Sequence, residues 1–213
     1  MLLLLDNEPD PEKRYHVEAL RDHLPEHEVY AYTKKGGQPD LDGVDGVVIS
    51  GSTAGVYEDD DHPWIRDQRA FVRRLVDEEM PTLGVCFGHQ IVNDALGGTV
   101  EHRGMRAGFV ETDLADDPLF DGVESVVPAV HGDYVTELGE GMEPIGSEPD
   151  YPLFASRHET APVRTVQYHP EFTADLENYL TEQFDWDGSG HSFEDCTADR
   201  TYRNFERLVA DGA

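Results

Sequence analysis

Residues 84–90 read Gly-Val-Cys-Phe-Gly-His-Gln and describe a reactive thiol on a strand-to-helix turn. The preceding residues 81–85 are typical of a short buried strand, and residues 89–96 have the pattern of a helix. Glycines two positions before and after Cys86 permit the tight turn of a G-x-nucleophile-x-G elbow. Unpaired N–H groups and the helix dipole favour the thiolate there. The sequence predicts a cysteine nucleophile, with an inert buried cysteine as the alternative.

A candidate base for this nucleophile lies in residues 167–171, Gln-Tyr-His-Pro-Glu, directly after a β-branched run at residues 163–166. Residues i and i+2 of an extended segment point to the same side, so His169 and Glu171 can reach one site. The imidazole would take the thiol proton while the carboxylate fixes its tautomer. A surface pair is the alternative for an isolated His-x-Glu, but the elbow upstream favours the catalytic interpretation.

Four segments resemble the signatures of the class I glutamine amidotransferases, which are triad enzymes: residues 84–90, residues 167–172, residues 47–52 with 56–58, and residues 131–135. The third segment resembles the family's oxyanion-strand loop. The fourth resembles a loop in the glutaminase domains of GMP synthetases. Their order and approximate spacing agree with the family from residue 1 to about 184. The resemblance implies a flavodoxin-like three-layer α/β fold, with a mostly parallel central sheet and the cysteine nucleophile elbow.

The same resemblance implies a role for each matching residue. Cys86 would be the nucleophile, His169 the general base and then acid, and Glu171 the orienting carboxylate. The N–H groups of Gly51 and Phe87 would form the oxyanion hole, which stabilises the negative oxygen of a tetrahedral intermediate. The residues implied to hold the glutamine or glutamyl group are Gln90, His131, Gly132, Asp133 and Tyr134. An ordinary polar turn is the alternative for residues 131–133.

Two positions distinguish this chain from related sequences. The family loop commonly has two glycines where this chain has Gly51 and Ser52, so we expect a side chain near the oxyanion site. The protease and chaperone branch of the superfamily usually places a histidine directly after its cysteine. This chain has Phe87 at that position, which disfavours a protease.

Composition limits the remaining possibilities. The length of 213 residues fits one domain, residues 1–213, that can bury a full core. The formal net charge is −29, and such a chain repels itself until salt screens the charges. We therefore expect a halophilic host. The shortage of basic residues argues against partners such as nucleic acids or anionic membranes.

Cysteine usage and hydropathy indicate the compartment. Cys86 and Cys196 do not form a disulfide framework, which favours a reducing environment. The apolar run at residues 2–5 is too short for a signal-peptide core, and no other stretch approaches membrane-spanning length. We expect a cytoplasmic protein. His191 and Cys196 alone are weak evidence for a metal site, so no metal and no cofactor are expected.

Hydrophobic periodicity predicts an alternation of strands and helices. Strands are expected at residues 2–5, 44–49, 81–85, 109–112, 126–130, 153–155 and 163–166, and helices at residues 12–24, 62–79, 89–96 and 201–210. The apolar positions on helical spacing, which are expected to face the core, are Tyr15, Ala19 and Leu20 in the first helix and Ile65, Phe71, Val72 and Leu75 in the second. Such alternation implies a mostly parallel sheet covered on both faces. Ligands bind such sheets beyond the carboxyl ends of the strands. Ser50, Cys86 and His169 all follow predicted strand ends. Residues 185–200 form an apparent insertion: a surface loop, a lid or a partner contact.

Three functions are compatible with these residues. The first is a glutaminase that hydrolyses the side-chain amide of L-glutamine and supplies ammonia to a separately encoded ATP-dependent synthetase, such as a GMP synthetase. The alternative is a stand-alone hydrolase of γ-glutamyl amides or peptides, which Ser52 and residues 185–200 favour. The third is a non-catalytic binding module, which the intact triad disfavours. The ammonia acceptor, the partner and the oligomeric state are left open.

Overall fold

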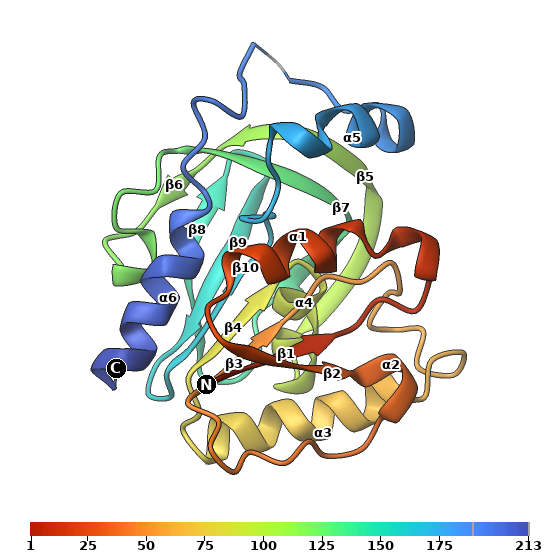
Figure 1. Cartoon of the computed structure of the whole chain (residues 1–213), viewed down its shortest axis with the longest axis vertical. Helices are drawn as coiled ribbons and strands as arrows, with labels where there is room; N and C mark the ends of the chain where they lie inside the picture. The colour runs from red at the N-terminus through yellow and green to blue at the C-terminus, as the bar shows by residue number, and fades with distance from the viewer. Residues whose placement is uncertain (189, 213) are drawn as a thin grey trace.

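A central eight-stranded sheet with helices on both faces organises the computed structural model, which describes residues 1–188 and 190–212 (Figure 1). The strands lie in the order β2-β1-β3-β4-β10-β9-β8-β6. The first five are parallel to one another, and each of the last three runs antiparallel to its neighbour. The predicted α/β fold with a mostly parallel sheet is therefore confirmed, with an antiparallel edge that the sequence pattern did not indicate.

The elements have the following bounds. The strands of the main sheet are β1 (Leu2–Asp6), β2 (His27–Ala31), β3 (Gly46–Ile49), β4 (Thr82–Val85), β6 (Asp113–Leu114), β8 (Met142–Glu148), β9 (Tyr151–His158) and β10 (Val163–Val166). A separate two-stranded antiparallel sheet contains β5 (Thr99–Glu111) and β7 (Val126–Glu137). The helices are α1 (Tyr15–His23), α2 (Tyr32–Lys35), α3 (Trp64–Asp77), α4 (Phe87–Ala95), α5 (Glu177–Phe184) and α6 (Arg200–Asp211).

The core lies on both faces of the parallel strands because successive side chains of a strand point to opposite sides. Leu2 and Leu4 belong to a buried cluster that includes side chains of α1 and α6. Leu3 and Leu5 belong to a second cluster with α3 and α4. The four residues of α3 predicted to face the core are all buried: Ile65, Phe71, Val72 and Leu75. Strand β1 is thus covered on both faces, as an apolar run predicts.

Some element boundaries differ from the sequence expectation. The helix expected over residues 12–24 is split into a short 3₁₀ turn, Pro11–Lys13, and α1. In α1, Val17 is fully buried, whereas Ala19, expected to face the core, is partly exposed. Helix α4 begins at Phe87 rather than at residue 89, so the helix starts immediately after the predicted nucleophile. Strands β2, β6 and β8 and helices α2 and α5 were not expected.

The β5–β7 sheet and the segment after α5 form a layer of their own. In Figure 1, α5 lies beside the long strands β5 and β7 at the top of the view. Phe109 of β5 packs edge-to-face against Trp186, with ring centroids 5.1 Å apart, and against Phe193 at 4.8 Å. The described part of residues 185–200 is therefore anchored to β5 by aromatic contacts. Residue 189 of that segment, and residue 213, lie outside the described residues. Within the described ranges, no helix is long and apolar enough to cross a membrane.

Candidate active site

Cys86 occupies a sharp turn between β4 and α4. Its backbone has φ 54° and ψ −105°, a conformation that residues other than glycine rarely adopt and that clusters at functional sites. The flanking glycines have a steric reason. A Cβ at Gly84 would lie 2.5 Å from the carbonyl oxygen of Gly88, and a Cβ at Gly88 would lie 2.3 Å from the carbonyl oxygen of Ile49. Side chains at either position would push α4 away from the sheet.

His169 and Glu171 form a buried pair at the end of β10. Nδ1 of His169 lies 2.7 Å from Oε1 of Glu171, and the imidazole stacks on Phe172 with ring centroids 4.2 Å apart. Nε2 of His169 lies 3.1 Å from the carbonyl oxygen of Val130, and the thiol of Cys86 lies 3.8 Å from the same oxygen. The thiol and the second imidazole nitrogen therefore both lie next to the same carbonyl oxygen.

The electrostatics of this group favour a charged imidazole. Burial lowers the pKa of His169, but Cys86 and Glu171 oppose burial and hold that pKa well above its usual value. Burial alone would raise the pKa of Glu171, but the effect of the adjacent His169 is larger than that of burial. The pKa of this carboxyl is therefore lowered. The two directions agree with each other. An imidazolium between a carboxylate and a thiolate is the state that an activated cysteine needs.

The two residues predicted to supply oxyanion-hole N–H groups, Gly51 and Phe87, both lie next to the Cys86–His169 pair. Phe87 is the first residue of α4, and the first N–H groups of a helix have no acceptor within it. Gly51 follows β3 and lies beside His169: a Cβ at Gly51 would be 3.4 Å from Cε1 of that ring. The side chain of Ser52 accepts a hydrogen bond from the N–H of Ala54 at 3.0 Å. The serine that replaces the second family glycine thus closes a turn in its own loop.

A cavity of about 320 Å³ opens beside the thiol. Of the residues expected to hold substrate, Gln90, His131, Gly132 and Asp133 line it, together with Cys86 and His169. Tyr134, expected in the same role, packs its ring against His131 with centroids 4.5 Å apart, outside the lining of the cavity. Burial lowers the pKa of His131 to about 3, so this ring is neutral at physiological pH.

A contact that the sequence did not indicate joins three residues that line the cavity, Tyr57, His102 and Asp133. Oδ1 of Asp133 accepts a hydrogen bond from the hydroxyl of Tyr57 at 3.0 Å and lies 2.9 Å from Nδ1 of His102. Burial and the neighbouring Asp133 raise the pKa of Tyr57 to about 12, so its hydroxyl remains a donor. Asp133 therefore links the loop after β3 to strand β5.

Tyr202 is a second contact that sequence analysis did not find. Its hydroxyl donates a hydrogen bond to Oε2 of Glu171 at 2.8 Å, and the ring is buried in α6. Burial and then Glu171 raise the pKa of Tyr202 well above its usual value, so it stays a donor. Both oxygens of Glu171 are thereby fixed. Tyr202 is 31 residues from Glu171 in the chain, and no local pattern pairs them.

We expect Tyr202→Phe to lower kcat by about tenfold with little change in KM, because Glu171 loses one charge-assisted hydrogen bond while the ring remains. The measurement is steady-state ammonia release. Tyr168→Phe is a matched control, since that buried tyrosine bonds the hydroxyl of Thr201 at 2.7 Å instead of Glu171. Equal losses in the two variants would mean that Tyr202 acts only through general packing.

The donor set offers little to a metal ion. Among residues 1–188 and 190–212 there is no group of three or more His, Cys, Asp or Glu side chains arranged to hold one. Burial raises the pKa of the Cys196 thiol, which lies outside the cavity lining.

Sequence comparison shows the family to which the chain is similar. The model of the class I glutamine amidotransferases matches residues 11–185. The chain is 37% identical over 152 residues to the glutamine-hydrolysing GMP synthase of Porphyromonas gingivalis, covering 68% of this chain and 28% of that protein. It is 32% identical over 165 residues to the corresponding enzyme of Enterococcus faecalis, covering 75% and 29%. The chain spans less than a third of the length of these curated relatives.

Structure comparison agrees. A solved glutamine amidotransferase from Thermotoga maritima superposes with a TM-score of 0.77 at 19% identity, covering 98% of both chains. A chain of PurLQS from the same organism superposes with a TM-score of 0.67 at 14% identity, again covering 98% of both. At such identities the likeness shows the shared fold. With a family model that covers most of its length, this chain belongs to the class I glutamine amidotransferase family.

Proposed function

We propose that the chain is a glutaminase that hydrolyses the side-chain amide of L-glutamine through Cys86, His169 and Glu171. The observation that carries the proposal is the convergence of the Cys86 thiol and Nε2 of His169 on one carbonyl oxygen, with Glu171 on the other side of the ring. This arrangement opens onto a cavity that Gln90 and residues 131–133 also line. Family membership supports the same chemistry.

The reaction follows from the positions of these groups. The Cys86 thiolate attacks the γ-carbonyl carbon, and the developing oxyanion accepts hydrogen bonds from the N–H groups of Gly51 and Phe87. His169 gives its proton to the nitrogen, the C–N bond breaks and ammonia leaves. Water then attacks the thioester while His169 takes its proton. Glutamate is released, and the Cys86 thiolate and the protonated His169 are restored.

The ammonia acceptor is the finer part of the proposal. We propose that the chain supplies ammonia to a separately encoded ATP-dependent synthetase that resembles the remainder of a GMP synthetase. The support for it is that the curated relatives reported above are glutamine-hydrolysing GMP synthases. Ammonia released without an acceptor is wasted. We therefore expect low activity in the isolated chain, raised when a partner reorders the loop that carries Gly51.

A second candidate function is a stand-alone hydrolase of γ-glutamyl amides or peptides. The cavity wall favours it in one respect, because Tyr15 of α1 and Phe184 of α5 line the cavity with aromatic surface. Phe184 immediately precedes the segment at residues 185–200. An aromatic wall suits an amine leaving group larger than ammonia.

One assay separates the two functions. Purified chain in molar KCl is given L-glutamine or γ-glutamyl dipeptides, with and without candidate synthetase subunits, and ammonia and free amino acid are measured. We expect glutamine turnover that rises at least severalfold with the correct subunit. Preferential cleavage of dipeptides would favour the stand-alone hydrolase. Inactivity toward every substrate, with every subunit, would refute both enzymes.

Two further proposals concern the host and the location of the protein. The net charge of −29 is the basis for a halophilic host, and parallel assays in dilute and molar KCl test it. A cytoplasmic location is proposed because a free Cys86 must stay reduced to act.

A further inference from the structure

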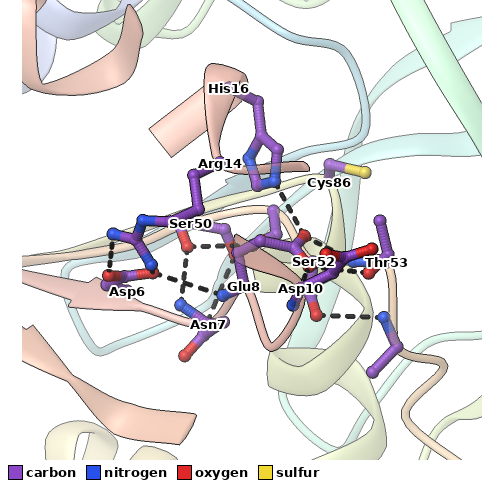
Figure 2. A network of polar contacts seen from close by, with 12 residues as sticks. Asp6, Asn7, Glu8, Asp10, Arg14, His16, Ser50, Ser52, Thr53 and Cys86 are labelled. Carbon is purple, nitrogen blue, oxygen red and sulfur yellow. Dashed lines mark hydrogen bonds and ion pairs between the residues drawn. The ribbon is translucent and has the colours of Figure 1, made fainter. Parts of the chain in front are cut away.

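A second carboxylate–imidazole pair lies beside the proposed triad. His16, in the first turn of α1, is 4% exposed, and its Nε2 lies 3.0 Å from Oε2 of Glu8. Glu8 follows β1 and is 2% exposed. Figure 2 shows His16 and Glu8 joined by a dashed contact, and His16 and Cys86 both line the cavity. Neither residue has a role in the reaction steps proposed above.

The contacts of Glu8 determine which nitrogen of the His16 ring donates to it. The carboxylate accepts hydrogen bonds from the N–H of Asp10 at 2.8 Å, the N–H of Thr53 at 3.0 Å and the hydroxyl of Thr53 at 2.7 Å. It is an acceptor in each of these contacts. Nε2 of His16 is therefore the donor in the fourth, and in a neutral imidazole the other nitrogen, Nδ1, is then an acceptor.

The unpaired nitrogen of His16 lies beside Gly51. Among the described residues, Nδ1 of His16 is buried and has no hydrogen-bond partner. A Cβ at Gly51 would lie 3.4 Å from this Nδ1 and 3.4 Å from Cε1 of His169, so Gly51 lies between two imidazoles. The ring centroids of His16 and His169 are 6.4 Å apart, and both rings line the cavity with Cys86. Buried polar atoms are nearly always paired, so an unpaired acceptor here points to a ligand donor.

We propose that Nδ1 of His16 accepts a hydrogen bond from the carboxamide N–H of the bound substrate, and that Glu8 is the positioning residue that aims the ring. This inference rests on the proposed glutaminase function. The reacting amide has two polar ends with opposite needs. Its oxygen requires N–H donors, which Gly51 and Phe87 supply. Its nitrogen carries N–H groups and requires an acceptor, and His16 Nδ1 is next to Gly51.

Glu8 has a second task in the same network. Through Thr53 it holds the loop that begins at Gly51, and through His16 it holds α1 (Figure 2). The substrate acceptor and the oxyanion loop therefore share one anchor. The orientation of the amide nitrogen is tied to that of its oxygen.

Two substitutions of similar size separate the two nitrogens of His16. His16→Gln places an amide where Nε2 lies and keeps the hydrogen bond to Glu8, but it removes the unpaired nitrogen beside Gly51. His16→Asn places a polar atom where Nδ1 lies and loses the tie to Glu8. We expect kcat/KM for glutamine to fall at least tenfold in His16→Gln and less in His16→Asn. A cooperative thermal unfolding transition checks that both variants are folded. A purely structural role predicts the reverse order, which would overturn the proposal.

A change of substrate gives the sharper test. The γ-methyl ester of glutamate forms the same thioester but has no N–H on its leaving group. We expect the loss in kcat/KM caused by His16→Gln to be at least tenfold smaller for the ester than for glutamine. Equal losses on both substrates, or no loss on glutamine, would overturn the inference and leave the proposed function standing. Wild-type protein without Cys86-dependent turnover of either substrate would instead refute the proposed function, and the inference with it.

Discussion

Cys86→Ala is expected to lower glutamine turnover by at least about 10⁴-fold, because no other group can form the thioester. The variant keeps its fold, since alanine fills less space than cysteine at this 7% exposed position. The measurement is ammonia release under saturating glutamine. A glutamine analogue that alkylates thiols should add its mass to the wild-type chain and not to Cys86→Ala.

Cys196→Ser is the control for Cys86→Ala. Cys196 is the other free cysteine of the described chain, and it lies outside the cavity lining. We expect this variant to retain wild-type turnover and to accept the alkylating analogue. Residual activity of Cys86→Ala close to that of Cys196→Ser would exclude Cys86 as the nucleophile.

Gly88→Ala is expected to destabilise the protein by on the order of 3 kcal/mol and to remove most activity. The added Cβ would lie 2.3 Å from the carbonyl oxygen of Ile49, a main-chain atom of the central strand β3 that cannot rotate away. Either α4 or the end of β3 must then move. Ile49 directly precedes the loop that carries Gly51, so the movement also disturbs the oxyanion hole.

Urea unfolding measures the free energy of unfolding of Gly88→Ala. Gly43→Ala is the comparison, because a Cβ at Gly43 meets nothing within 4 Å and the cost comes only from its positive φ of 77°. That cost is about 1 kcal/mol. If the two variants proved equally stable, the close approach of α4 to β3 would not be required by the fold.

The sequence predicted those parts of the site that depend on short-range chemistry. The spacing of Gly84, Cys86 and Gly88 predicted the elbow because Gly84 and Gly88 approach each other across one turn of chain, although the closest contact of a Cβ at Gly88, with Ile49, is not local. His169 and Glu171 were predicted as partners because i and i+2 share a face, and they lie 2.7 Å apart. Apolar strands and the helix face of α3 followed from periodicity for the same reason.

The parts that the sequence did not predict depend on contacts between distant segments. Tyr202 meets Glu171, and His16 and Thr53 meet Glu8, only after the sheet has been assembled. Strand β5 has several exposed positions, and the apolar run of β7 ends at Val130, so only parts of these long strands were expected. Tyr134 was expected at the substrate by its place in a motif, and its packing against His131 was not visible in the pattern.

The hydrogen bond between α6 and Glu171 has a consequence for the chain during its synthesis. Ribosomes make proteins from the N-terminus, so the thiol at Cys86 leaves the exit tunnel long before Tyr202 does. Strand β10, which ends beside the imidazole, must still insert between β4 and β9. A nascent or prematurely ended polypeptide therefore exposes a cysteine without a correctly held base. Full activity is therefore expected only after α6 has docked and the Tyr202 hydroxyl has reached Glu171.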